Sequence, residues 1–230
     1  MSNETANAER RRAMLDVIRS GVNDGKPMKV RQASVATRLA GQAPHLVPER
    51  AKKDAAGLKA QFRQFLEGQT ATVLDVVSMD AVPEAIAGYL RGQNLPLRVR
   101  VGSDAELAQL PWSREPALSL DKGHAYATDE VGLSRALAGI SETGTLVMAS
   151  GEANPVTLNY LPETHIVVLQ ASEIAGNYEA IFDTVRTRFG RGQMPRTLNF
   201  ISGPSRTADI GGRLVVGAHG PRRLCVIVVG

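Results

Sequence analysis

The chain has 230 residues, of which 43% are hydrophobic and 22% are charged, and its formal net charge at pH 7 is +4. This composition is that of an ordinary globular protein, with one α/β domain and an appended segment or with two small domains. No apolar run approaches the roughly 18 to 20 residues of a membrane-spanning helix, and the first twenty residues lack the apolar core of a secretory signal. We therefore expect a cytoplasmic protein without a membrane span.

The charge is unevenly distributed along the chain. Residues 1–63 carry 13 Lys and Arg against 6 Asp and Glu, a net charge of +7, whereas residues 64–230 carry 14 against 17, a net charge of −3. A basic segment of this kind can contact nucleic acid or an acidic partner. Acidic residues are interspersed among the basic ones, and the OB, RRM and zinc-finger signatures are absent. Solvated helix surfaces are therefore the favoured interpretation, and nucleic-acid binding is disfavoured.

The sequence contains one cysteine, Cys225, which lies in an apolar run and predicts a buried, unreactive thiol. One cysteine excludes an intrachain disulfide and an iron–sulfur cluster held by several thiolates of this chain alone. The four histidines, at 45, 124, 165 and 219, lack metal-ligand spacing, and no dinucleotide, P-loop, HExxH, CxxC or GxSxG motif occurs. We therefore expect no metal site and no cofactor in this chain, so that any iron–sulfur chemistry would come from a partner.

The N-terminal residues 1–69 are predicted to form a helical arm that packs on the main domain. Residues 5–20 have an apolar stripe opposite several arginines, which favours an amphipathic helix, and a second helix is expected at 49–67. The proline-containing segment 41–48 between them is expected to be extended. The arm has too few large apolar residues to form a core of its own.

Short strands and helices alternate from residue 70 to residue 230. Apolar runs predict strands at 71–77, 97–101, 145–149, 165–170, 198–201 and 224–229, with a short strand at 117–120. Helices are predicted at 83–90, 103–110 and 172–189, and residues 128–137 are predicted to be partly helical or turn-like. This alternation favours an α/β domain with a mixed or parallel sheet covered by helices on both faces.

Several polar residues cluster between the last two predicted strands, in the stretch 203–221. Ser205, Arg206 and Thr207 directly follow a strand, which is where open α/β folds meet their ligands. Arg206 is suited to bidentate binding of a carboxylate or phosphate, and a helix beginning there would add free N–H groups. Asp209 would orient Arg206 or accept a hydrogen bond from a ligand hydroxyl. The alternative is a capped loop with a structural Arg–Asp pair.

The same stretch contains a histidine between glycines. His219 lies in Gly217-Ala218-His219-Gly220, a setting with little steric crowding, and proton transfer is the role that its imidazole suggests. His219 and Asp209 are therefore the candidate catalytic residues. The sequence leaves open whether the chain is catalytic at all.

Two further segments carry candidate ligand-binding residues. Thr143-Gly144-Thr145 precedes a strand, and its glycine would let the backbone approach an anion while the hydroxyls donate to it; a simple turn is the alternative.

The loop at 151–162 offers Asn154, Asn159 and Tyr160 as pocket-lining residues, although exposed loop polarity explains them equally well. His165 begins the next apolar strand and is more typical of a half-buried histidine with its hydrogen bonds satisfied than of a base or ligand.

Four segments, 142–146, 161–166, 203–210 and 217–221, resemble in this order the LUD-domain family of lactate-utilization protein C (LutC, YkgG-like). The resemblance is best over residues 125–229, and the pair GPSRTADI and GAHGP is its most specific part. It implies a fold similar to the group of ribose-phosphate isomerase, CoA-transferase and formyltetrahydrofolate cyclo-ligase. It also implies a three-protein system that oxidises L-lactate to pyruvate, in which cysteine-rich, iron–sulfur partners carry the redox centres.

On this resemblance we expect an accessory or ligand-binding subunit of iron–sulfur-dependent L-lactate oxidation, with an anionic small molecule as its candidate ligand. The alternative is a stand-alone enzyme that acts on a phosphorylated, CoA-linked or folate-like small molecule, which rests on analogy of fold. The expected ligand site gathers residues from three segments: Thr143, Gly144, Thr145, Ser205, Arg206, Thr207, Asp209 and His219.

Overall fold

The computed structural model describes residues 3–23, 26–41, 46–190, 192–210 and 213–230. The chain divides into two compact units, Met1–His45 and Leu46–Gly230. The first unit contains two helices, α1 (Asn3–Asn23) and α2 (Met28–Ala40), whose described side chains are all at least partly exposed. The predicted helix at 5–20 is confirmed by α1, whereas α2 was not predicted.

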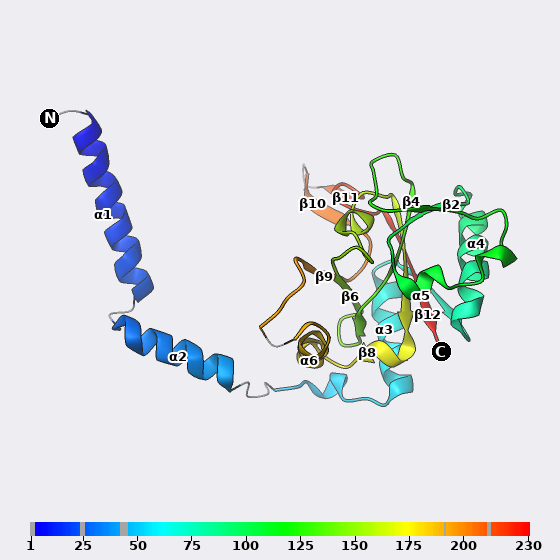
Figure 1. The fold of residues 1–230 in the computed structure, drawn as a ribbon, viewed down its shortest axis with the longest axis horizontal. Helices are drawn as coiled ribbons and strands as arrows, with labels where there is room; N and C mark the ends of the chain where they lie inside the picture. The colour runs from blue at the N-terminus through cyan, green and yellow to red at the C-terminus, as the bar shows by residue number, and fades with distance from the viewer. Residues whose placement is uncertain (1–2, 24–25, 42–45, 191, 211–212) are drawn as a thin grey trace. The chain divides into compact units, whose positions relative to one another are not determined.

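The second unit is built on a six-stranded, wholly parallel sheet (Figure 1). Its strands, in spatial order, are β1 (Thr72–Val76), β12 (Arg223–Val229), β7 (Thr164–Gln170), β4 (Val131–Arg135), β2 (Arg98–Val101) and β3 (Ser119–Lys122). The central strands β7 and β12 are buried along nearly their whole length. Burial on both faces explains why they appear in the sequence as continuous apolar runs.

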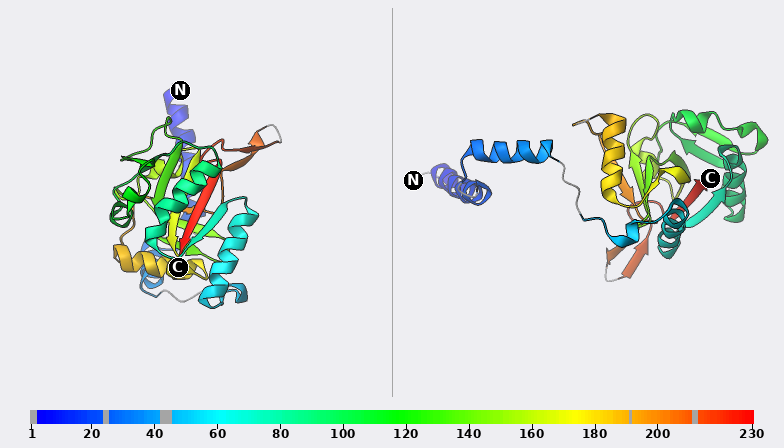
Figure 2. Two further views of the ribbon diagram at one scale, coloured as in Figure 1. Left: turned by 90° about the vertical axis from the view of Figure 1, so that its right-hand side faces the viewer. Right: turned by 90° about the horizontal axis from the view of Figure 1, so that it is seen from below.

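A smaller four-stranded sheet packs against the first. Its strands, in spatial order, are β8 (Ile174–Ala175), β5 (Ala138–Ile140), β6 (Thr145–Ala149) and β9 (Leu198–Ile201). A separate antiparallel hairpin of β10 (Arg206–Ile210) and β11 (Arg213–Val216) extends away from both sheets (Figure 2, left).

Helices cover both faces of the six-stranded sheet. The remaining helices are α3 (Ala55–Gly68), α4 (Val82–Gly92), α5 (Ala105–Ala108) and α6 (Tyr178–Phe189), with short 3₁₀ turns η1 (Glu49–Ala51), η2 (Met79–Ala81), η3 (Trp112–Arg114), η4 (Val156–Asn159) and η5 (Ala171–Glu173). Helix α4 packs Ile86 and Leu90 against one face, where Ile166 and Ile227 point. Helix α3 packs on the other face (Figure 1). The predicted α/β fold with helices on both faces of a parallel sheet is confirmed.

The second sheet shares its core with α3 and the first sheet. Leu146 and Met148 of β6 lie in the same cluster as Phe62 of α3 and Val167 of β7. Its other face is covered by α6, whose Ile181 packs with the core residues of β5. The layers are therefore α4, the six-stranded sheet, the second sheet with α3, and α6. None of the helices in the described residues combines the length and the apolar character needed to cross a lipid bilayer.

Three predicted elements differ from the structure. The helix predicted at 172–189 begins only at Tyr178, because residues 171–175 form η5 and β8, and Asn177 caps it by accepting from Ala180 N at 3.0 Å. Residues 131–135 form a strand and not a helix. The chain at Arg206 enters β10, so the helix proposed to begin there is wrong.

Helix α3 belongs to the second unit, although the sequence placed it in the arm of residues 1–69. Phe62 and Leu66 are completely buried in the core shared by the two sheets. The division between the units therefore falls after His45, well before residue 69. The packing of an arm on the main domain stays a prediction.

The substitution Phe62→Ala tests this placement of α3. Removing a fully buried phenyl ring should lower the free energy of unfolding by about 3–5 kcal/mol. The matched control Met14→Ala, on the exposed surface of α1, should change it by less than about 0.5 kcal/mol. Urea unfolding of both variants measures the two values, and equal effects would contradict the assignment of α3 to the core.

Candidate functional site

Thr143 and Thr145 form a hydroxyl cluster with Tyr178 and Ser202. Thr145 Oγ1 lies 2.7 Å from Thr143 Oγ1 and 2.7 Å from Ser202 Oγ. The Tyr178 hydroxyl lies 3.3 Å and 3.4 Å from the two threonine oxygens. Ser202 directly precedes the stretch 203–221, so the cluster connects the threonine segment to the residue before that stretch.

Gly144 holds the turn of this cluster against α3. Its φ of +62° is a conformation that side chains disfavour, and a Cβ there would lie 2.6 Å from Phe65 Cβ and 2.9 Å from Leu66 N. The glycine is therefore required by the close approach of the helix. A ligand contact at Gly144 stays a prediction.

Backbone hydrogen bonds hold the Ser205 loop (203–207) beside the His219 loop (217–221). Ser205 N donates to Pro221 O at 2.8 Å, and Gly217 N donates to Ser205 O at 2.9 Å. Thr207 then pairs with Val215 in the hairpin of β10 and β11. The two most specific sequence segments are thus neighbours in space.

Arg206 binds the end of α3. Its Nη2 donates to Gln69 O at 2.9 Å and to Thr70 Oγ1 at 2.5 Å. Thr70 has a φ of +66°, which is strained for a β-branched residue, and the arginine bonds to its side chain. The side chain of Asp209 lies outside the described residues, so the predicted pairing of Arg206 with Asp209 is not described. Anion binding by Arg206 stays a prediction.

The ring of Tyr160 lies against the His219 loop. A Cβ on Gly220 would lie 3.4 Å from Ser205 Cβ and 3.7 Å from Tyr160 Cδ1, which places the ring against the His219 loop. The Tyr160 hydroxyl donates to Asn199 Oδ1 of β9 at 3.0 Å. Tyr160 therefore links the surface loops to the second sheet.

Ser134, Asn159 and His165 are completely buried polar residues, and Asn199, the partner of Tyr160, is half-buried. His165 Nε2 lies 3.1 Å from Ser134 Oγ on the neighbouring strand β4. Four other polar atoms are buried without a hydrogen-bond partner among the described residues: His165 Nδ1, both amide atoms of Asn159, and Asn199 Nδ2.

The backbone register indicates which surfaces His165 and Asn199 face. His165 pairs in register with Gly132 of β4, and a Cβ on Gly132 would lie 3.0 Å from the carbonyl oxygen of Leu158, the residue before Asn159. Asn199 pairs with Met148, whose side chain faces the first sheet. Asn199 therefore faces the first sheet from β9, and η4 lies over Gly132, the neighbour of His165 in the sheet.

Complete burial lowers the pKa of His165 to about 3. Desolvation disfavours the charged imidazolium, and the Ser134 hydroxyl is neutral. His165 is therefore uncharged at neutral pH. It is completely buried, in contrast to the half-buried histidine that the sequence favoured, and one of its two nitrogens has no partner among the described residues.

A pocket of about 410 Å³ opens beside the His219 loop. Its lining comes from two segments: residues 160–163 and residues 216–220 with Arg222. His219 is exposed, and the charges beside it are Arg222 and Glu163, whose Nη1 and Oε2 atoms lie 3.7 Å apart. A spacing of 3.7 Å between exposed side chains is a weak ion pair, so Arg222 remains accessible to an anion.

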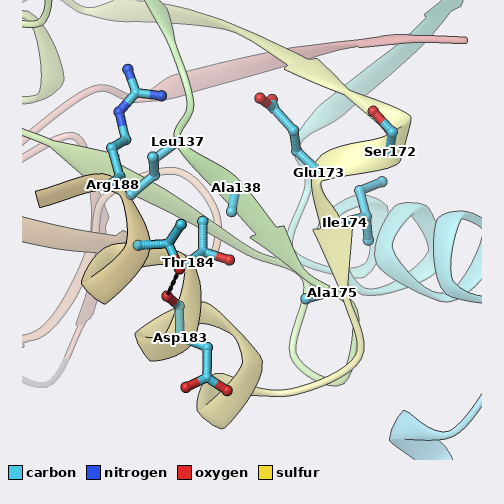
Figure 3. Close-up of a pocket in the computed structure, with 10 residues that line it drawn as sticks. Leu137, Ala138, Ser172, Glu173, Ile174, Ala175, Asp183, Thr184 and Arg188 are labelled. Carbon is cyan, nitrogen blue, oxygen red and sulfur yellow. Dashed lines mark hydrogen bonds between the residues drawn. The ribbon is translucent and has the colours of Figure 1, made fainter. Parts of the chain in front are cut away.

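A second pocket, of about 520 Å³, lies between α6 and the strands β5 and β8. Figure 3 shows Arg188 and Glu173 extending from its two walls over the apolar side chains of Leu137 and Ala138. None of the predicted site residues is among its described lining residues.

Asn154 lines a third, smaller pocket of about 180 Å³. It is buried, and its side chain donates to Ala149 O at 3.2 Å.

The prediction of a buried thiol at Cys225 is confirmed. Cys225 is completely buried in β12, and burial raises its pKa to about 12.

In the part of the chain that the structure describes, no three His, Cys, Asp or Glu side chains gather closely enough to hold a metal ion.

The LUD domain family model matches residues 37–229, which is most of the chain. The chain therefore belongs to the LUD-domain family, and the resemblance predicted from the four sequence segments is confirmed. A DUF162 family protein from Deinococcus radiodurans has a similar fold, with a TM-score of 0.58 and 24% identity, over 77% of this chain and 99% of that chain.

Three curated relatives illustrate the similarity. A lactate utilization protein C from Shouchella clausii is 29% identical over 77% of this chain and 76% of its own length. An uncharacterized protein from Neisseria meningitidis serogroup B is 31% identical over 66% of each chain. Lactate utilization protein C of Bacillus subtilis is 34% identical over 43% of this chain and 42% of its own.

The buried His165 predicts a specific dependence of stability on pH. Its folded pKa of about 3 lies below the ordinary value of 6.5, so below pH 6.5 the unfolded chain binds a proton that the folded chain does not. This group's contribution to stability is complete above pH 6.5 and falls as the pH drops towards 3, by about 2 kcal/mol at pH 5.

Urea unfolding of wild type and His165→Gln at pH 8 and pH 5 measures this contribution. The variant should lose less stability than wild type on acidification, whereas the exposed control His219→Gln should follow wild type. Parallel pH profiles of wild type and His165→Gln would contradict an uncharged, buried imidazole.

Proposed function

We propose that this chain is an accessory or ligand-binding subunit of an iron–sulfur-dependent system that oxidises L-lactate to pyruvate in the cytoplasm. The observation that carries the proposal is the similarity to a lactate utilization protein C over about three quarters of both chains, 77% and 76%. Membership of the LUD-domain family supports it. The proposal assigns the chain a role in binding and leaves the redox centres to its partners.

The chemistry of Cys225 supports the placement of the redox centres in other subunits. It is the only thiol in the sequence, and its burial and raised pKa keep it protonated and inaccessible. A cluster bound by several cysteines would therefore belong to cysteine-rich partner proteins. In this proposal electrons pass through those partners, and this chain binds a small molecule or holds the assembly together.

The pocket beside the His219 loop is the proposed place for an anionic ligand. Arg222 supplies a positive charge, and His219 supplies an exposed imidazole that can donate a hydrogen bond or transfer a proton. Ser205 and Thr207 shape the neighbouring loop through their backbone bonds. A role of Arg206 in the same site would require it to exchange its bonds to Gln69 and Thr70 for the ligand.

The hydroxyl cluster is proposed as a second part of the site. Thr145 bonds to both Thr143 and Ser202, and the hydroxyl groups of these residues can reorient towards a ligand. A stand-alone enzyme with a phosphorylated, CoA-linked or folate-like substrate is the alternative function. It rests on fold analogy, and the experiments below separate it from the subunit role.

Growth on L-lactate tests the proposed pathway. A strain that lacks this chain should fail to grow, or grow slowly, on L-lactate as sole carbon source, and the wild-type chain should restore growth. His219→Ala should restore it poorly because the pocket loses its imidazole. His124→Ala, an exposed histidine outside this pocket, is the matched control and should restore growth fully. Normal growth of the deletion strain would contradict the proposed function.

Co-purification tests the subunit role. The tagged chain, isolated from its own cells grown on lactate, should elute with partner proteins that contain iron. Elution of the chain alone and free of iron would contradict the accessory role and favour a stand-alone enzyme. In that case phosphorylated, CoA-linked and folate-like compounds would be screened for a shift of the melting temperature.

A further inference from the structure

We infer that Glu163 makes the pocket beside the His219 loop selective for small carboxylates with a single negative charge. The inference deepens the proposed function, on which it rests for the choice of this pocket and of an anionic ligand. Its basis is the position of the Glu163 carboxylate, which lies near two arginines on the wall of the pocket.

The two arginines beside Glu163 keep hydrogen-bond donors for a further anion. Glu163 Oε2 lies 3.7 Å from Arg222 Nη1 and 3.7 Å from Arg223 Nη1. Both spacings exceed the roughly 2.9 Å of a charge-assisted hydrogen bond. Neither guanidinium group has a hydrogen-bond acceptor among the residues that the structure describes. A ligand carboxylate can therefore accept hydrogen bonds that Glu163 leaves unmade.

The backbone holds these residues together. Arg223 N donates to Glu163 O at 3.1 Å, where the neighbouring strands β12 and β7 begin. Gly217 of the His219 loop has a φ of +85°, and a Cβ there would lie 2.8 Å from Arg222 Cβ. The loop thus packs directly on the stem of Arg222. The acid and the arginines consequently stay beside the pocket when a ligand moves the Glu163 side chain.

The Glu163 carboxylate is easily displaced from the arginines. The side chains of Glu163 and Arg222 are 61% and 52% exposed, so water and salt screen their attraction. An ion pair of this kind contributes little free energy. A ligand anion that takes the place of the carboxylate therefore breaks only a weak contact, but the negative charge of Glu163 remains close to it.

The balance of charge favours a ligand with one negative charge. Glu163 is the only Asp or Glu, and Arg222 the only Lys or Arg, among the described residues that line this pocket. Arg223 adds a second positive charge beside Glu163, so the three side chains sum to +1. A monocarboxylate balances this sum, whereas a second negative charge on the ligand would be repelled by Glu163 without an arginine to offset it.

The repulsion by Glu163 grows with the charge of the ligand. In water, two like charges about 5 Å apart repel each other enough to weaken binding of a monoanion about fourfold. The energy doubles for a dianion, so the factor is squared to about sixteenfold. Removing the charge of Glu163 should therefore favour the dianion more than the monoanion.

L-Lactate and L-malate, which differ by one carboxylate group, test this selectivity on the full-length chain. Calorimetric titration at low ionic strength gives the dissociation constants for wild type and Glu163→Gln. The variant should bind L-lactate about fourfold and L-malate about sixteenfold more tightly than wild type does. The matched control Glu152→Gln, at an exposed acid outside the pocket, should leave both constants unchanged. Arg222→Gln should weaken the binding of both ligands.

Circular dichroism and melting temperature establish that each variant is folded. An equal change of both dissociation constants in Glu163→Gln, or weaker binding of either acid, would overturn the inference. The absence of binding of both acids to wild type and Glu163→Gln at millimolar concentration would also overturn it. Growth on L-lactate is measured independently of binding, so the proposed function can stand where this inference fails.

Discussion

The hydrogen bond from the Tyr160 hydroxyl to Asn199 Oδ1 connects the parts on which the candidate site depends. On one side of it lie the Ser205 and His219 loops, which backbone hydrogen bonds hold together. On the other side lies β9, whose Asn199 shares the face of Met148 that packs towards the first sheet. This contact relates the family's surface segments to the second sheet.

The arrangement of the two sheets makes this contact available. The six-stranded sheet provides His165 and Ser134 near the middle of the domain, and β9 of the second sheet provides Asn199. The turn η4 covers Gly132 so closely that a Cβ there would lie 3.0 Å from the carbonyl oxygen of Leu158, two residues before Tyr160. Tyr160 thus connects the pocket beside the His219 loop to β9 of the second sheet, whereas the parallel fold alone would have directed attention to the carboxyl ends of its strands.

The sequence correctly predicted those strands and buried residues that depend only on neighbouring residues in the chain. The apolar runs gave β7 and β12 correctly, and Cys225 was correctly expected to be buried. The strand β4 was missed because Gly132, which packs under η4, and Ser134, which bonds to His165, interrupt its apolar run. The two-residue strand β8 is too short for any periodic signal. The partners of the predicted threonines, Tyr178 and Ser202, lie tens of residues away in the chain, so only the fold brings them together.

The most direct test of this account is a double-mutant cycle between Tyr160 and Asn199. The free energy of unfolding would be measured for wild type, Tyr160→Phe, Asn199→Ala and the double variant. We expect a coupling energy of about 1 kcal/mol, the usual contribution of one intramolecular hydrogen bond to the free energy of unfolding. Additive effects, with a coupling energy below about 0.3 kcal/mol, would contradict the claim that Tyr160 joins the surface loops to β9.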